Sequence, residues 1–129
     1  MTVVIDASVL VALWLDAEAS DAIADRLRGE SLHAPDHLLV ESTNVLRRRR
    51  NAGLLASAAA DVAFAGVMRT PARLWPFAAV ADRAWQLGTN ASAYDAAYLA
   101  LAERVDAPLL TRDRRLTGIP GLTCVIEVI

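Results

Sequence analysis

Short apolar runs alternate with longer amphipathic stretches along the whole chain. Apolar, often β-branched runs predict strands at 2–6, 31–34, 72–76, 108–111 and 123–128. Apolar residues at helical spacing predict helices at 7–15, 16–29, 36–51, 57–70, 77–87 and 94–105, and a helical turn at 114–116. Strands separated by helices are typical of parallel βαβ units with helices on both faces of the sheet. We therefore expect one α/β domain over residues 1–129.

Acidic residues adjoin four of these apolar elements, namely Asp6, Glu41, Asp95 and Asp113. Asp6 ends the first expected strand, and Asp113 follows the fourth. Glu41 lies within an apolar helical stretch, and Asp95 opens an almost wholly apolar helix. Ligands of open parallel sheets bind outside the carboxyl ends of the strands. If the first and fourth strands are neighbours, these acids converge on one site.

Convergence of four carboxylates requires a compensating positive charge. Two like charges about 4 Å apart repel by roughly 4 kcal/mol at an effective dielectric near 20. A divalent cation removes that repulsion, and an all-oxygen ligand set favours Mg²⁺ or Mn²⁺ over Zn²⁺. Asp6 and Asp95 are the expected direct ligands, whereas Glu41 and Asp113 are expected to act directly, through water or in proton transfer.

Each acid also has a purely structural interpretation. Asp6 and Asp113 are suited to capping the helical segments that follow them. Ser92 and Asp95 have the spacing of a capping box. Glu41 has the helical spacing for an ion pair with Arg48. The metal interpretation is favoured because the structural one must be invoked separately for every acid.

The charge balance gives no global sign of nucleic-acid binding, since the net charge is −2. All 13 basic residues are arginine, whose planar guanidinium suits phosphate oxygens. The run 47–50 cannot face one way on a helix, and it can also be read as a solvated helix end that complements the helix dipole. Candidate contacts to the phosphate groups of a substrate beside the acids are Asn44, Arg48, Arg112, Arg114 and Arg115.

Other features bound the class of protein. The single cysteine, Cys124, excludes an internal disulfide, is interpreted as a small core residue of the last strand and favours a reducing cytoplasm. No signal peptide is expected, and no apolar run reaches the roughly 18 residues of a membrane span. A phosphotransfer domain would also place acids at strand ends, but its usual lysine partner is missing because the chain has no lysine.

Four segments carry a family resemblance, at 4–8, 40–46, 92–102 and 110–116. In this order and spacing they resemble PIN-domain nucleases, in particular the VapC-type toxins of bacterial toxin–antitoxin pairs. The resemblance implies a three-layer α/β/α domain with a central parallel sheet of about five strands, the first beside the fourth. It assigns Asp6, Glu41, Asp95 and Asp113 to metal binding, and Ser8 and Thr111 to support of the metal shell. Many relatives carry a further acid where Arg114 and Arg115 stand here.

The resemblance also implies an activity and partners. It implies a Mg²⁺- or Mn²⁺-dependent endoribonuclease toxin that cleaves tRNA or rRNA loops, inhibits translation, forms a homodimer and is neutralised by a VapB-type antitoxin. The apolar residues Val9, Leu13 and Trp14, with the helix over 57–68, are candidates for the antitoxin groove, unless they pack as ordinary core. The alternative is a catalytically inactive PIN-like module that binds RNA or protein.

Overall fold

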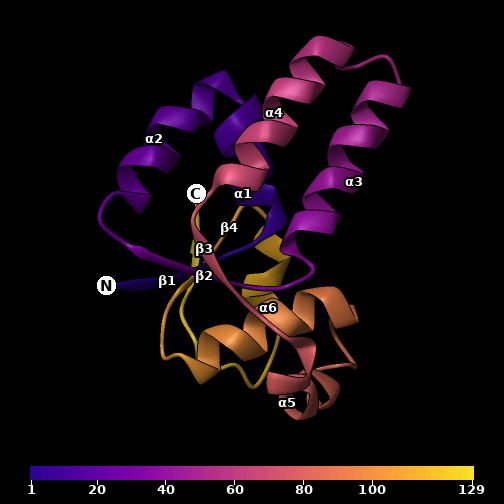
Figure 1. Cartoon of the computed structure of the whole chain (residues 1–129). Helices are drawn as coiled ribbons and strands as arrows, with labels where there is room; N and C mark the ends of the chain where they lie inside the picture. Colours follow the sequence, from indigo (N-terminus) through magenta and orange to yellow (C-terminus); the bar gives the residue numbers. More distant parts are fainter.

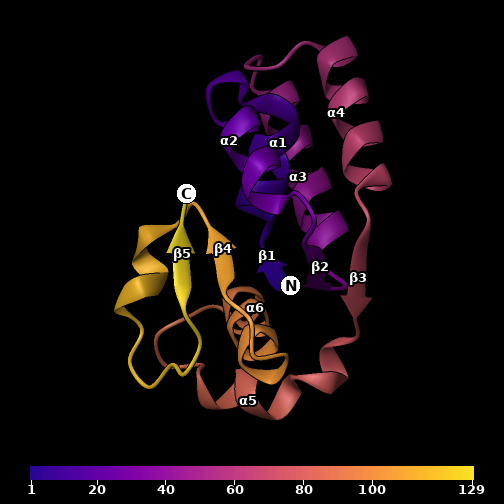
Figure 2. The same ribbon diagram turned by 90° about the vertical axis from the view of Figure 1, so that its left-hand side faces the viewer.

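A five-stranded parallel sheet organises the computed structural model, which describes residues 1–129 (Figures 1 and 2). The strand order is β3-β2-β1-β4-β5. The strands are β1 (Thr2–Ile5), β2 (Ser31–Pro35), β3 (Ala72–Trp75), β4 (Leu109–Thr111) and β5 (Ile126–Val128). The α/β class and the adjacency of the first and fourth strands are therefore confirmed.

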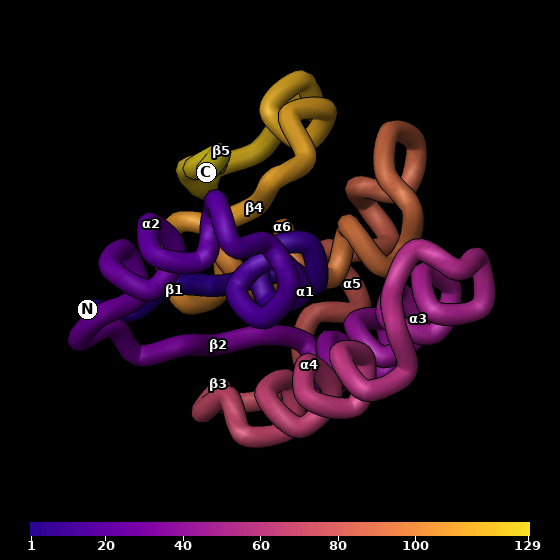
Figure 3. Tube along the Cα trace, turned by 90° about the horizontal axis from the view of Figure 1, so that it is seen from above, coloured from indigo at the N-terminus to yellow at the C-terminus, as the bar shows by residue number.

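Helices flank the sheet as outer layers, with α1 to α4 on one side and α5 and α6 on the other (Figures 1 and 3). None of them is long and apolar enough to cross a membrane. They are α1 (Ala7–Leu15), α2 (Ala17–Leu27), α3 (Leu38–Asn51), α4 (Ser57–Arg69), α5 (Ala81–Gln86) and α6 (Ala93–Arg104). Two short 3₁₀ segments, η1 (Phe77–Ala79) and η2 (Arg114–Gly118), complete the chain.

The core is centred on β1 and α6. Val3, Val4 and Ile5 are fully buried, as expected for a central parallel strand covered on both faces. Every residue of α6 from Ala96 to Ala102 is buried. The alternation of alanines with Tyr98, Leu99 and Leu101 lets this helix lie close against β1 and β2. Burial of these residues thus fixes the orientation of α6, and with it the direction in which the side chains of its first turn point.

Several expected boundaries differ from the structure. The helix expected over 77–87 is split into η1 and α5, because Val80 has φ −128° and interrupts the helical backbone. The helix expected from residue 36 begins only after His37, which makes no side-chain cap. The last strand starts only at Ile126, so half-buried Cys124 precedes it rather than lying within it. It still packs against the core as a partly buried residue.

Candidate active site

Asp6 stands at the junction of β1 and α1, where the chain leaves the sheet. Its carboxylate Oδ1 accepts the backbone N–H of Val9 at 3.1 Å, so it is the N-cap of α1. The same oxygen accepts the hydroxyl of Ser8, and Oδ2 accepts the hydroxyl of Thr111. The residue is buried, yet both carboxylate oxygens are hydrogen-bonded. Capping and a possible role as ligand are thus compatible in one side chain.

Ser8 and Thr111 connect the ends of two neighbouring strands through Asp6. The Ser8 hydroxyl accepts the backbone N–H of Arg112 at 3.0 Å, and the Thr111 hydroxyl accepts that of Asp113 at 3.0 Å. Thr111 is fully buried. Each hydroxyl therefore donates a hydrogen bond to Asp6 and accepts one from a backbone N–H of the segment after β4. This network fixes the position and rotamer of Asp6.

Glu41 lies in the first turn of α3 and is held by two aromatic neighbours. Its Oε2 accepts the hydroxyl of Tyr98 at 3.3 Å, across 57 positions of sequence. The Nε2 of His37 lies 3.7 Å from the same oxygen. Tyr98 is buried in the core, so this contact ties Glu41 to α6. Glu41 therefore leans toward α6 rather than forming a surface ion pair with Arg48.

Asp95 occupies the first turn of α6, which borders the start of α3. The Ser92 hydroxyl caps this helix by accepting the Asp95 backbone N–H at 3.1 Å. The capping interpretation of Ser92 is confirmed, and it leaves the Asp95 carboxylate free for another role. That carboxylate and Glu41 both line one hollow between α3 and the start of α6.

Asp6, Glu41 and Asp95, here called the acid triad, perturb one another electrostatically. Burial raises the pKa of each carboxyl. Their charges add to this: Asp95 raises the pKa of Asp6, and both Asp6 and Asp95 raise that of Glu41. Three half-buried or buried acids with raised pKa values, grouped this way, are a candidate site for a positively charged ligand.

Asp113, the fourth acid, behaves differently. It lies just after β4. Its carboxylate is close enough to the triad for its charge to raise the pKa of Asp95. Its carboxylate, however, is gripped by Arg115, whose Nη2 lies 2.6 Å from Oδ2 and whose Nε lies 3.0 Å from Oδ1. It also caps η2 through the Arg115 backbone N–H. The hydrogen bonds from Arg115 lower the pKa of Asp113.

The chemistry of the donors fits a hard divalent cation, although the side chains are not drawn together around one point. No three of the acids are close enough, as they stand, to share an ion. The Nε2 of His37 lies 3.7 Å from Glu41 Oε2, but the triad itself offers only carboxylate oxygens. Such donors suit Mg²⁺ or Mn²⁺. Convergence of all four acids is therefore only partly observed: Asp113 is held aside by Arg115.

A hollow of about 380 Å³ lies beside the triad between α1 and α3. Ser8, Glu41, Val45, Arg49 and Arg112 line it, together with Asp16. Arg112 lies 3.4 Å from the Asp16 carboxylate.

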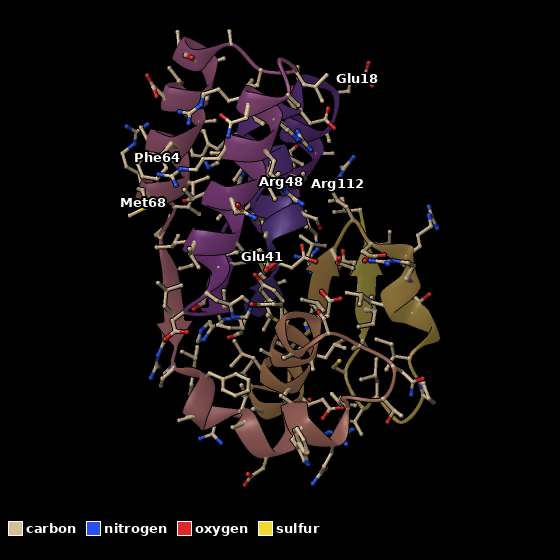
Figure 4. All side chains as sticks on the ribbon, turned by 90° about the vertical axis from the view of Figure 1, so that its right-hand side faces the viewer. Glu18, Glu41, Arg48, Phe64, Met68 and Arg112 are labelled. Carbon is tan, nitrogen blue, oxygen red and sulfur yellow. The ribbon has the colours of Figure 1, made fainter.

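The arginine of α3 that lines this hollow, together with Arg112, is Arg49 and not the expected Arg48. Arg48 is exposed on the same helix, farther along than Glu41 (Figure 4). Arg114 and Arg115 are also exposed, at the far side of Asp113. Asn44 lines the hollow that Glu41 shares with Asp95.

The expected apolar groove is only partly present. Val9 is fully buried in the core and cannot line a surface. Trp14 is partly exposed, donates to Thr70 Oγ1 at 3.0 Å and packs on Gly66 of α4. Exposed apolar side chains on α4 include Phe64 and Met68, which lie along one edge of the molecule (Figure 4). Phe64 also lines a hollow of about 200 Å³ between α3 and α4.

Comparison with known proteins places this geometry in a family. The PIN-domain family model matches residues 3–122. The chain belongs to the PIN-domain family. Among curated relatives of this PIN-domain chain, ribonuclease VapC12 of Mycobacterium tuberculosis is 38% identical over 127 residues, which is 98% of both chains.

Solved structures of PIN-domain relatives share the fold. The M. tuberculosis VapC20 structure, described as a sarcin–ricin loop cleaving toxin, has a TM-score of 0.67 at 22% identity, covering 97% of this chain and 99% of its own. A VapBC2 structure from Rickettsia felis, bound to a fragment of promoter DNA, has a TM-score of 0.70 at 13% identity, covering 98% of each chain.

Sequence reasoning missed three residues at the site of this PIN domain: Tyr98, His37 and Arg49. Tyr98 follows Asp95 by three positions, and His37 precedes Glu41 by four, so both share a helix face with an acid. This spacing was the available signal. Arg49 follows Glu41 by eight positions, about 80° around an ideal helix, so spacing does not select it over Arg48. The aromatic contacts to Glu41 needed the tertiary packing of α3 on α6.

Proposed function

We propose that this protein is a Mg²⁺- or Mn²⁺-dependent endoribonuclease of the VapC toxin type. The observation that carries the proposal is the acid triad at the carboxyl end of the sheet, where burial raises the pKa of all three carboxyls and the charges of Asp6 and Asp95 raise that of Glu41 further. Curated relatives named as ribonucleases, at up to 38% identity in the matches above, support the same activity. The reaction is hydrolysis of an RNA phosphodiester.

Each residue of the site has a proposed task. The acid triad would hold the cation, with Asp113 joining it once Arg115 releases that carboxylate. A cation bound there would supply neutralisation of charge on the phosphodiester and activation of a water for in-line attack. Ser8 and Thr111 are proposed as positioning residues, because their hydroxyls fix both oxygens of Asp6. Tyr98 orients Glu41 from the core.

The arginines near the triad would guide the RNA backbone. Arg49 and Arg112 line the hollow that contains Glu41, so a phosphate in that hollow would meet guanidinium donors. Arg48, Arg114 and Arg115 are exposed farther out and would contribute to the field that attracts RNA. We expect Arg49→Ala to weaken RNA binding and to flatten its salt dependence more than Arg48→Ala.

The activity is tested with purified protein and an end-labelled, mixed-sequence RNA in Mg²⁺, Mn²⁺ or EDTA. We expect cleavage in either metal, none in EDTA, and none with Asp6→Asn. Asp21→Asn is the matched control, since Asp21 is exposed on α2 away from the site, and it should cleave normally. Undiminished cleavage by a folded Asp6→Asn protein would refute the assignment.

The RNA class is proposed from the relatives. VapC20 of M. tuberculosis is described as cleaving the sarcin–ricin loop. We propose that this protein likewise cuts structured tRNA or rRNA loops and thereby inhibits translation. Sequencing of RNA ends after brief expression identifies the target, with Asp6→Asn as the background. Ends scattered evenly over all transcripts would contradict a loop-specific toxin.

We propose a VapB-type antitoxin as the protein partner. The R. felis structure contains a VapB–VapC pair, which supports this partner. The exposed residues Trp14, Phe64 and Met68 would give the antitoxin an apolar surface beside the arginines of α3. We also propose a homodimer, which analytical ultracentrifugation of the isolated protein tests directly.

The inactive-module alternative predicts RNA binding without cleavage. It leaves unexplained why three acids that destabilise one another are placed at one end of the sheet. The cleavage assay above separates the two functions.

A further inference from the structure

A second hollow, of about 450 Å³, opens on the other side of the triad. It lies where the N-terminal turns of α3 and α6 meet. Its volume is within the range of about 300–1,000 Å³ found for small-ligand sites. The side chains that matter for a ligand are His37, Asn44, Ser92 and Tyr94, with the acids Glu41 and Asp95 at its edge.

Tyr94 presents an aromatic surface in this hollow. The residue is 64% exposed, although the same helix is buried from Ala96 to Ala102. Its ring centroid lies 5.5 Å from that of His37, at an interplanar angle of 66°. The His37 ring packs in the same way on Tyr98, at 4.9 Å. Tyr94 is therefore the outermost ring of a row of three, and it contacts His37, the middle ring.

Neutral polar groups surround this ring. Asn44 is exposed one turn after Glu41, and the Ser92 hydroxyl caps α6 at the rim. The Nε2 of His37 is buried and has no hydrogen-bond partner within the protein. The hollow thus offers an aromatic face and amide and hydroxyl groups.

These properties select one part of an RNA chain. A phosphate group is disfavoured, because Glu41 and Asp95 contribute negative charge and no arginine lines the hollow. A nucleobase is neutral, stacks on aromatic rings and presents hydrogen-bonding edges to amides. The hollow and the arginine-lined hollow share Glu41, so a strand crossing the triad would meet both.

We propose that this hollow is a nucleobase subsite, in which Tyr94 stacks on a base next to the cleaved phosphodiester and Asn44 contacts the base edge. The inference rests on the proposed ribonuclease function and adds to it a determinant of sequence preference. Tyr94 and Asn44 contact substrate in this arrangement without taking part in the chemistry.

The test measures binding apart from cleavage. Fluorescence anisotropy is recorded in EDTA with labelled single-stranded oligo-U, oligo-C, oligo-A and oligo-G. Loss of one stacked base weakens binding by roughly 5- to 150-fold, so we expect Tyr94→Leu to fall in that range. Tyr94→Phe should bind like the parent. Asn44→Ala should change the ratio of affinities among the four oligonucleotides.

Trp85→Leu is the matched control, because Trp85 is 86% exposed on α5 and lines a different hollow. It removes an exposed aromatic ring without touching the subsite, and it should bind as the parent does. If Tyr94→Leu, folded by circular dichroism, binds within twofold of Trp85→Leu, the subsite proposal is wrong.

The outcomes also separate the subsite from the ribonuclease proposal. Metal-dependent cleavage by the parent, with Tyr94-independent binding, overturns the subsite alone. Tyr94-dependent binding without any cleavage supports the subsite and overturns the ribonuclease proposal.

Discussion

Thr111 offers the sharpest test of how the site is assembled. Its fully buried hydroxyl donates to the Asp6 carboxylate and accepts the backbone N–H of Asp113 at 3.0 Å. Thr111→Val keeps the shape of the side chain but removes both hydrogen bonds. A hydrogen bond to a charged group contributes about 1.5–3 kcal/mol and a neutral one about 0.5–1.5 kcal/mol. We therefore expect Thr111→Val to lower the free energy of unfolding by about 2–4 kcal/mol.

Thr111→Ser is the matched control. It keeps the hydroxyl and removes one buried methyl group, which costs about 1 kcal/mol. Urea unfolding in EDTA, followed by tryptophan fluorescence, compares the two variants with the parent. Equal losses for valine and serine, or a smaller loss for valine, would show that packing and not hydrogen bonding fixes Thr111.

The same pair of variants tests the link to metal binding. Groups that orient a ligand typically change metal affinity by about 10- to 100-fold when removed. We expect Thr111→Val to weaken Mn²⁺ binding by that factor, because Asp6 loses the donor to its Oδ2. Thr111→Ser should bind Mn²⁺ like the parent. Unchanged Mn²⁺ affinity in the valine variant would remove Thr111 from the support of the site.

Three further outcomes follow from the contacts. Arg115→Gln should tighten Mn²⁺ binding by up to about fivefold in titrations, since this exposed pair to the fourth acid is weak; Arg114→Gln should not. The pKa values of the triad are raised in the folded protein. Ionisation of these acids therefore destabilises the metal-free fold as pH rises from their ordinary pKa values of 3.8–4.5 through their folded pKa values. The triple carboxamide variant should thus gain stability over the parent in EDTA as pH increases, and a constant difference would refute this. Gly66→Ala places a Cβ directly against the Trp14 ring. It should lower the free energy of unfolding by about 1–3 kcal/mol, whereas Gly118→Ala, with open space around it, should not.

The arrangement of the elements was predictable because it depends on short-range patterns. The apolar runs locate all five strands to within a few residues, and the last differs most. That strand is short and only partly buried, so its apolar pattern extends beyond its hydrogen bonds. The break between η1 and α5 was not predictable, since alanine-rich sequence is compatible with one continuous helix.

The side chains around the acids were less predictable, because their directions depend on neighbouring helices. Spacing alone places Arg48 on the face of Glu41, but packing of α3 beside α1 turns Arg49 into the hollow. Likewise the sequence places Val9 in an apolar helix, and only the fold shows that it is fully buried. The pairing of Asp113 with Arg115 depends on the turn geometry of η2.

Mn²⁺ binding to the acid triad is the most direct test of the central claim. Electron paramagnetic resonance of the purified protein counts bound Mn²⁺ in the parent, Asp95→Asn and the control Asp21→Asn. We predict a saturable Mn²⁺ site in the parent and in Asp21→Asn that is lost in Asp95→Asn. Equal Mn²⁺ binding by all three proteins would contradict a metal centre built on these acids.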